Sequence, residues 1–187
     1  MTGCLVTERM LLRRFTEADL DWLAELHGDP RVMRYIDDGR PVAAAVVEAE
    51  TLPAILRDDA ELPDGLGYLA AREEPGGRPL GWFGLRPPSS SGLDRAATDT
   101  AELGYRLFPA VWGRGYATEG ALALVRLAFT ELGLERVLAT TMTVNVASRR
   151  VLEKAGLSLV RTFHAQWPTY IEGAEHGDVV YEIARQD

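Results

Sequence analysis

The sequence predicts a mixed α/β (α+β) fold, in which one mixed sheet carries helices on its faces. Short apolar segments typical of strands outnumber the segments with helical periodicity. Most of the predicted strands follow one another along the chain, which favours antiparallel neighbours. One stretch, residues 101–144, has the order strand–helix–strand that is typical of a parallel crossover. The 187 residues are expected to form a single domain, residues 1–187.

The first half of the chain mixes strands with three helical segments. Thr16 is a favoured N-cap residue for the first helix, and Gly28 ends it. The polar stretch 86–100, rich in Pro and Ser, is expected to be a mobile connection within a hairpin, too polar to pack. The predicted elements are strands at 10–15, 66–72 and 79–85 and helices at 17–28, 30–36 and 42–57.

The second half contains the crossover. Gly104 lies inside the strand predicted at 101–108, and an isolated strand glycine suggests a bulge. The next helix ends at Gly133, and Asn145 can cap a shorter helix that Gly156 ends. The remaining strands are predicted at 136–144, 157–163 and 178–184. One continuous face of the longer helix is expected to carry Ala121, Leu122, Val125, Ala128, Phe129 and Leu132.

Charge and composition exclude several classes of protein. The net charge is −8, from 20 basic and 28 acidic residues, which speaks against a nucleic-acid partner. No stretch approaches the roughly 20 apolar residues of a membrane span, and the N-terminus lacks a secretory pattern. Cys4 is the single cysteine, so neither an internal disulfide nor a cysteine-based zinc site is expected. A cytoplasmic protein without a bound metal is expected.

The segment "WGRGYATEG", residues 112–120, lies between the predicted strand and the longer helix. Two glycines expose successive backbone N–H groups, and the following helix places roughly half a positive charge at its N-terminus. Arg114 between the glycines adds a full charge. The segment therefore indicates a phosphate site, or a glycine-rich loop needed only for a sharp turn.

Two familiar phosphate sites do not match this segment. No Gly-Lys-Ser/Thr ends the turn, which excludes a P-loop. Thr118 occupies the position where a dinucleotide fingerprint needs a third glycine. Glu131 and Glu135 fall at the helix end and in its exit loop, not at the end of a second strand. A dinucleotide-dependent oxidoreductase is thereby disfavoured.

The stretches "ELGYRLFPAVWGRGYATEGALALVRLAF" and "NVASRRVLEKAGL" resemble the GNAT superfamily of acyl-CoA-dependent N-acetyltransferases. Within it, the chain resembles the branch that includes the ribosomal-protein N-terminal acetyltransferases. The superfamily pattern begins with Gln or Arg, where this chain has Trp112, and continues with Gly115 and Ala117. The resemblance covers essentially the whole chain. It implies a mostly antiparallel mixed sheet of about seven strands, splayed at a bulged strand, with helices on both faces.

The resemblance also implies acetyl-CoA as co-substrate. Its pantetheine arm would run beside the bulged strand along the backbone of Tyr105, Arg106 and Leu107, with the Leu107 N–H as an oxyanion donor. Asn145 would contact this arm, or serve only as an N-cap. The pyrophosphate would bind the turn made by Trp112, Gly113, Arg114, Gly115, Tyr116, Ala117 and Thr118.

Two residues are candidates for proton transfer. Glu102 precedes the expected bulge, where relatives often carry an acid, and could collect the proton of the amine; otherwise it is a solvated strand residue. Ser148 shares the inward face of the short helix, and its hydroxyl either protonates the leaving thiolate or is a core hydroxyl. His27, His164 and His176 lack metal-ligand spacing and are expected to be loop histidines.

The resemblance implies direct transfer of an acetyl group from acetyl-CoA to a primary amine in a ternary complex. The acceptor could be a protein N-terminus, a polyamine or an aminoglycoside-like amine, and the protein a monomer or homodimer. Trp167 and Tyr170 could line the acceptor mouth, or simply pack. The alternative function is a non-catalytic acyl-CoA-binding or ligand-sensing module.

Overall fold

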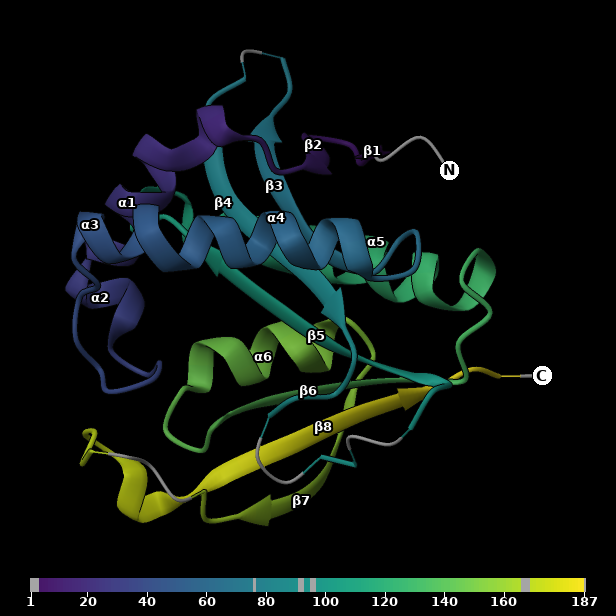
Figure 1. The fold of residues 1–187 in the computed structure, drawn as a ribbon. Helices are drawn as coiled ribbons and strands as arrows, with labels where there is room; N and C mark the ends of the chain where they lie inside the picture. The colour runs from purple at the N-terminus through teal and green to yellow at the C-terminus, as the bar shows by residue number, and fades with distance from the viewer. Residues whose placement is uncertain (1–3, 76, 91–92, 95–96, 166–168, 187) are drawn as a thin grey trace.

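The computed structural model describes residues 4–75, 77–90, 93–94, 97–165 and 169–186. Eight strands form one sheet in the order β1-β2-β3-β4-β5-β6-β8-β7 (Figure 1). β5 and β6 pair in parallel, whereas the other neighbours are antiparallel, so the predicted mixed sheet is confirmed. Seven of these strands were predicted from the sequence, and the three-residue β1 was not. The strands are β1 (Cys4–Val6), β2 (Met10–Arg14), β3 (Gly67–Glu73), β4 (Pro79–Arg86), β5 (Thr100–Leu107), β6 (Arg136–Met142), β7 (Ser158–Phe163) and β8 (Asp178–Ala184).

Helices cover both faces of the sheet (Figure 1). Trp82 and Phe83, neighbours on β4, point to opposite faces. Trp82 packs with residues of α1 and α4 in one apolar cluster, and Phe83 packs with α5 and α6 in the other. The α-helices are α1 (Leu20–Gly28), α2 (Pro30–Met33), α3 (Ala44–Val46), α4 (Leu52–Glu61), α5 (Tyr116–Thr130) and α6 (Val146–Lys154), with a π-helical turn, η2 (Val47–Thr51), between α3 and α4 and 3₁₀ turns η1 (Glu17–Asp19), η3 (Pro109–Val111) and η4 (Ala174–His176).

Helix α5 packs very closely on β4. A Cβ atom at Gly120 would lie 2.3 Å from Cζ of Phe83, so only glycine allows this approach. The buried face differs slightly from the predicted one. Ala121, Val125 and Ala128 are buried as expected, but Leu122 is 47% exposed, and Leu124 and Leu127 are buried in its place. The helix is apolar on most sides, so periodicity alone could not locate the face that meets the sheet.

The sheet opens between β5 and β6, but not through the predicted bulge. β4 and β5 pair in step from Gly81↔Leu107 to Arg86↔Glu102, and Gly104 lies opposite Gly84 without a register shift. The prediction of a bulge at Gly104 is therefore wrong for the pairing of β5 with β4. The parallel pairing of β5 with β6 ends at Glu102, and beyond it the two strands diverge (Figure 1).

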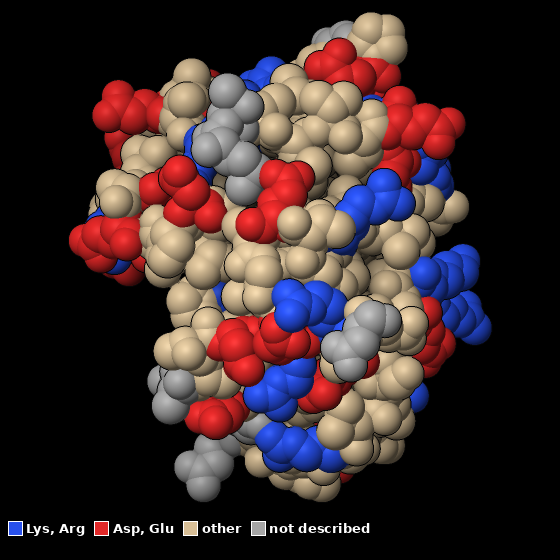
Figure 2. Space-filling view, turned by 90° about the vertical axis from the view of Figure 1, so that its right-hand side faces the viewer, with Lys and Arg blue, Asp and Glu red and all other residues tan. Residues whose placement is uncertain are grey.

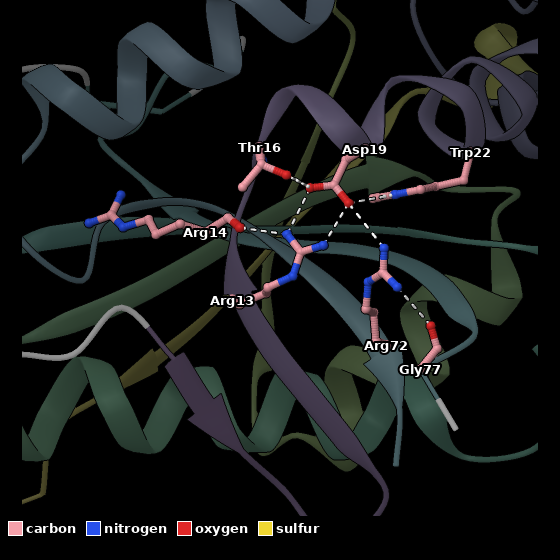
Figure 3. A network of polar contacts seen from close by, with 7 residues as sticks. All are labelled: Arg13, Arg14, Thr16, Asp19, Trp22, Arg72 and Gly77. Atoms are coloured by element: carbon pink, nitrogen blue, oxygen red, sulfur yellow. Dashed lines mark hydrogen bonds and ion pairs between the residues drawn. The ribbon is translucent and has the colours of Figure 1, made fainter. Parts of the chain in front are cut away.

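A buried carboxylate fixes the start of α1 against the sheet (Figure 3). Asp19 is fully buried and accepts two hydrogen bonds from Arg13, both at 2.7 Å, and one from the Trp22 indole at 2.8 Å. Thr16 and Arg72 also donate to it. Burial alone would raise the pKa of Asp19, but these hydrogen bonds and the Arg13 charge hold it far below its usual range.

Acidic and basic side chains are interspersed on the face shown in Figure 2, with no continuous basic stripe there. None of the helices in the described part of the chain is long and apolar enough to cross a membrane. Within those same residues, no three His, Cys, Asp or Glu side chains are grouped so that they could hold a metal ion.

Candidate active site

A cavity of about 560 Å³ occupies the opening between β5 and β6. Its wall includes side chains from both faces of the sheet. Glu102 and Arg106 of β5 lie on the α1 side, whereas Tyr105 of β5 and Ser148 of α6 lie on the α5 side. The loop after α2 contributes Asp37 to the rim. The cavity thus runs through the sheet, and it brings together both predicted catalytic residues.

Backbone groups of β5 also face this opening. The Phe108 amide donates to the Leu80 carbonyl at 2.9 Å, so Phe108 and every second residue before it direct their backbone groups to β4. Arg106 is one of these residues, so its backbone does not face the opening, contrary to the prediction. The N–H groups of Tyr105 and Leu107 point the other way, toward the opening.

Two hydroxyl groups meet on the α5 side of the cavity. The Tyr105 and Ser148 hydroxyls lie 3.0 Å apart. Burial raises the pKa of Tyr105 to about 12, against the smaller lowering effect of the Ser148 hydrogen bond, so the phenol stays protonated at neutral pH. The Tyr105 side chain was missed in the sequence, although strand alternation from Glu102 places it on the face of the short helix.

Asn145 serves as the N-cap of α6. Its side-chain oxygen accepts the Ser148 amide at 3.2 Å, and its side-chain nitrogen donates to the Thr141 hydroxyl at 3.1 Å. Asn145 also lines the cavity. These bonds support the capping role and fix the start of the helix that carries Ser148.

Glu102 is 3% exposed and saturated with hydrogen bonds, so the solvated alternative is wrong. The Ser89 amide and hydroxyl donate to Oε2 at 3.0 and 3.1 Å, and the Ser90 amide donates to the same atom at 3.1 Å. The hydroxyls of Ser90 and Thr140 donate to Oε1, the latter at 3.3 Å. The connection after β4, expected to be too polar to pack, instead buries Pro88 and binds the carboxylate.

Opposing effects set the pKa of Glu102. Burial raises it, whereas hydrogen bonds from Ser90 and Ser89 and the positive charge of Arg86 lower it, and the lowering prevails. The carboxylate is therefore ionised at neutral pH. It can accept a proton or stabilise a nearby cation, but it is a weak base.

The glycine-rich turn has the backbone shape expected of an anion site. Gly113 and Gly115 have φ of 72° and 86°, the left-handed region that favours glycine. Gly115 is the N-cap of α5, and open space surrounds the position that a Cβ atom of Gly113 would take. Arg114 is exposed beside them, and its carbonyl accepts a bond from Arg9 at 3.0 Å. The turn thus presents backbone amides, the helix N-terminus and the Arg114 guanidinium, whereas the Arg9 guanidinium is ion-paired with Glu119 at 2.6 Å.

The other residues of the turn have mainly structural contacts. The Trp112 indole donates to the Leu107 carbonyl at 2.8 Å, which ties the turn to the end of β5. The Tyr116 hydroxyl donates to Glu73 at 2.6 Å. Ala117 and Thr118 lie half-buried in the first turn of α5. Their backbone amides are therefore at the helix N-terminus, as a phosphate site requires.

His27 is buried in α1, not in a loop as expected. Burial, reinforced by the nearby Arg106 charge, lowers its pKa to about 4, so the ring is neutral at pH 7. It lies 3.4 Å from the Trp82 indole nitrogen and the Arg106 guanidinium. This cluster was not found from the sequence, because the three residues come from different elements.

The remaining predicted loop residues lie elsewhere. His164 follows β7, and His176 is in η4. Tyr170 is exposed, and its hydroxyl donates to Glu175 at 3.2 Å. Trp167 lies outside the described residues.

Comparison with known proteins identifies the family. The model described as "Acetyltransferase (GNAT) domain" matches residues 9–158. The chain is also 38% identical over 184 residues to the FsC-acetyl coenzyme A-N(2)-transacetylase of Aspergillus fumigatus, a match that covers 98% of this chain and 77% of that protein. The chain belongs to the GNAT acetyltransferase family, and it is an N-acetyltransferase that uses acetyl-CoA.

Solved structures show the same fold. A GNAT acetyltransferase from Bacillus anthracis superposes with a TM-score of 0.77 at 22% identity, covering 97% of this chain and 98% of that one. RimL, a ribosomal L7/L12 alpha-N-protein acetyltransferase in complex with coenzyme A, also superposes with a TM-score of 0.77, at 14% identity and 97% coverage of both chains. At these identities the likeness concerns the fold and does not place this chain in the ribosomal-protein branch.

Proposed function

We propose that this acetyltransferase moves the acetyl group directly to a primary amine within the cavity between β5 and β6. One observation carries the proposal: the cavity has an ionised carboxylate, Glu102, on one side of the sheet and the hydroxyl pair of Ser148 and Tyr105 on the other. An amine that enters on the Glu102 side meets a carboxylate that can take its proton. A thiolate that leaves on the Ser148 side meets a hydroxyl that can protonate it. The bound acetyl-CoA supplies the activated acetyl group.

Glu102 receives the proton of the amine. A primary amine is mostly protonated at neutral pH, with a pKa of about 8 for an α-amino group and about 10 for lysine, and only the neutral form attacks a carbonyl. A low-pKa carboxylate that is already held by five hydrogen bonds takes this proton best through water. Its charge also favours the arrival of a cationic amine.

Ser148 gives a proton to the thiolate that leaves, and Tyr105 holds the Ser148 hydroxyl in position. A thiol has a pKa of about 8.5 if it behaves like cysteine, so the thiolate is a tolerable leaving group and the acid contributes modestly. The Leu107 N–H, which faces the opening, donates to the carbonyl oxygen as negative charge develops there. The turn from Gly113 to Thr118 holds the pyrophosphate.

The acceptor is an amine of a small molecule or of a protein N-terminus. The Aspergillus fumigatus relative is named an N(2)-transacetylase, and RimL is named an alpha-N-protein acetyltransferase. The non-catalytic alternative is set aside, because the chain belongs to a family of acetyltransferases.

A thiol-release assay with acetyl-CoA tests the proposal. The panel contains N-terminal peptides, amino acids, polyamines and aminoglycosides, and mass spectrometry identifies the acetylated product. We expect acetyl-CoA-dependent amide formation with at least one amine class. Binding of acetyl-CoA without thiol release from any acceptor would contradict the proposal and support a sensing role.

A further inference from the structure

Two arginine side chains line the same side of the cavity as Glu102, and the proposed mechanism uses neither. In the β4–β5 pairing, Arg86 lies opposite Glu102, and Trp82 lies opposite Arg106. Directly opposed residues share a face of the sheet, so all four side chains stand on the side from which the amine enters. Gly104 lies between Glu102 and Arg106 on β5, and the Arg86 guanidinium and the Trp82 ring approach it.

Arg106 is largely buried and has no tightly bound anion. Its side chain is 16% exposed, and its guanidinium lies over the Trp82 ring at 5.3 Å. Burial lowers its pKa, against the raising effects of Asp37 and Tyr68, and the positive charge of Arg86 adds a smaller lowering effect. Its other contacts are the neutral His27 ring at 3.4 Å and the sulfur of Met33 at 3.7 Å. Neither contact offsets the charge.

The carboxylates of the cavity are poorly placed to neutralise Arg106. Among the described residues, Asp37 is the one carboxylate within ion-pair distance of it, at 3.9 Å, and Asp37 is 74% exposed at the rim. Glu102 is bound by Ser89, Ser90 and Thr140. Asp178 is buried and accepts the Ala165 amide at 3.3 Å. Arg106 therefore retains guanidinium N–H donors that can bind a ligand.

Arg86 adds a second positive charge on this side. One of its terminal nitrogens donates to the Tyr68 hydroxyl at 2.9 Å. Its Nε atom is buried and has no hydrogen-bond partner within the described residues. A Cβ atom at Gly104 would lie 3.6 Å from the other terminal nitrogen, so this guanidinium reaches over Gly104, beside the Trp82 ring. Arg86 and Arg106 thus place two guanidinium groups on the same side of the cavity as the Glu102 carboxylate.

We propose that the acceptor carries a carboxylate in addition to its amine, and that Arg106 binds this carboxylate and determines acceptor specificity. This inference rests on the proposed function. A planar guanidinium matches a carboxylate in a two-pronged geometry, and a carboxylate ligand would supply the counter-charge that a largely buried arginine lacks. Arg86 supports the same anion electrostatically. The site thus takes zwitterionic acceptors of the amino-acid or peptide class.

The spacing along β5 fits such a molecule. Arg106 lies four positions after Glu102 on β5, which corresponds to about 13 Å between their Cα atoms. An acceptor can therefore place its amine near Glu102 while its carboxylate contacts Arg106. Polyamines and aminoglycosides carry no carboxylate, so they would leave the Arg106 guanidinium without a ligand counter-charge.

Thiol release with acceptors that differ only at the carboxylate tests the inference. Lysine, lysinamide and cadaverine share the same terminal amine, and a short peptide and its C-terminal amide form a second matched set. We expect kcat/KM of the wild-type protein to be at least tenfold higher for the carboxylated member of a set, mainly through KM. Equal kcat/KM values within both sets would overturn the inference while leaving acetyl transfer intact. No thiol release with any amine would instead contradict the proposed function and, with it, the inference.

Arg106→Gln should remove the preference by raising KM for the carboxylated acceptor at least tenfold, while the amide member and acetyl-CoA keep their KM values. Arg106→Lys, which retains the charge, should restore part of the preference. Arg126→Gln, on the exposed face of α5, is the matched control and should change nothing. Thermal unfolding of each variant shows whether it folds. Equal losses for carboxylated and amidated acceptors in folded Arg106→Gln would assign Arg106 to structure only and overturn the inference.

Discussion

The Tyr105 hydroxyl lies 3.0 Å from the Ser148 hydroxyl, at the side of the cavity opposite Glu102. The two residues come from β5 and α6, the elements that border the opening in the sheet. Because burial keeps the phenol protonated, it can donate to Ser148 while Ser148 donates onward. In the proposed mechanism, this pair forms a short proton path toward the thiolate that leaves.

Ser148→Ala should lower kcat about tenfold and leave the KM for acetyl-CoA nearly unchanged, because a proton donor acts mainly in the transition state. This loss is smaller than the roughly 10²- to 10⁴-fold that is usual for general acid–base catalysis, because a thiolate leaves readily without a proton donor. Steady-state kinetics measure it. A variant that loses stability but not kcat would show that Ser148 is a structural hydroxyl.

Tyr105→Phe should have a smaller effect on kcat, because Ser148 remains as the immediate donor. Since Tyr105 acts through Ser148, the double variant should be no slower than Ser148→Ala alone. Comparison of kcat among the wild type, both single variants and the double variant tests this coupling. Independent, multiplicative losses would show that the two hydroxyls do not act as one path.

Glu102→Gln should lower turnover about 10²-fold at neutral pH. Part of the loss should return as the pH rises, because the amine then loses its proton without help. The pKa of Glu102 is lowered, so in the wild type the fall of activity below neutral pH follows protonation of the amine and not of Glu102. A pH–rate profile of the variant parallel to that of the wild type would remove Glu102 from proton transfer.

Gly113→Val should weaken acetyl-CoA binding at least tenfold, about 1.4 kcal/mol, because a branched side chain would occupy the space over the turn. The change also strains a backbone with positive φ. Gly133→Val is the matched control: Gly133 has φ of 65° and equally open surroundings, but follows the other end of α5. Calorimetric titration with acetyl-CoA compares them. Equal affinities for the two variants would place the phosphate site elsewhere.

Asp19→Asn should lower the free energy of unfolding by about 3 kcal/mol at pH 7, because Arg13 would lose its buried partner. The pKa of Asp19 is depressed in the folded state, so its stabilisation is present above the unfolded pKa of about 3.9 and is lost as the pH falls further. The difference between variant and wild type should therefore shrink toward about pH 3. Urea unfolding at both pH values measures it, and a constant difference would show that the charge of Asp19 is not responsible.

Much of the fold could be predicted because strands and helices have distinct periodicities. The turn with Gly113 and Gly115 was recognisable because only a few backbone shapes join a strand to a helix so sharply. The opening of the sheet was expected for the wrong reason. The bulge was inferred from Gly104, but β5 pairs with β4 without a register shift there. Instead, β5 pairs with β6 only from Thr100 to Glu102, and no local sequence pattern indicates where this pairing stops.

The environment of the site was harder to predict because it depends on contacts between distant segments. Glu102 was recognised as a candidate, but its burial under Ser89 and Ser90 depends on how the polar connection folds back. Likewise, Arg106 was assigned a backbone role, while its side chain lies with His27 and Trp82 in a cluster from three elements. The alternation of side chains along β5 was the available signal. It places Glu102 and Arg106 on one face of the sheet and Tyr105 on the other.

Direct transfer between the two sides of the cavity is tested by one single-turnover experiment with acetyl-CoA labelled in the acetyl group. The protein is mixed with the labelled acetyl-CoA, with and without an active amine, and mass spectrometry follows the label on the chain and on the amine. We expect the label to appear on the amine nitrogen only, and no label on the protein when the amine is absent. Acetyl label on Ser148, Tyr105 or another side chain that passes to the amine at the turnover rate would contradict direct transfer.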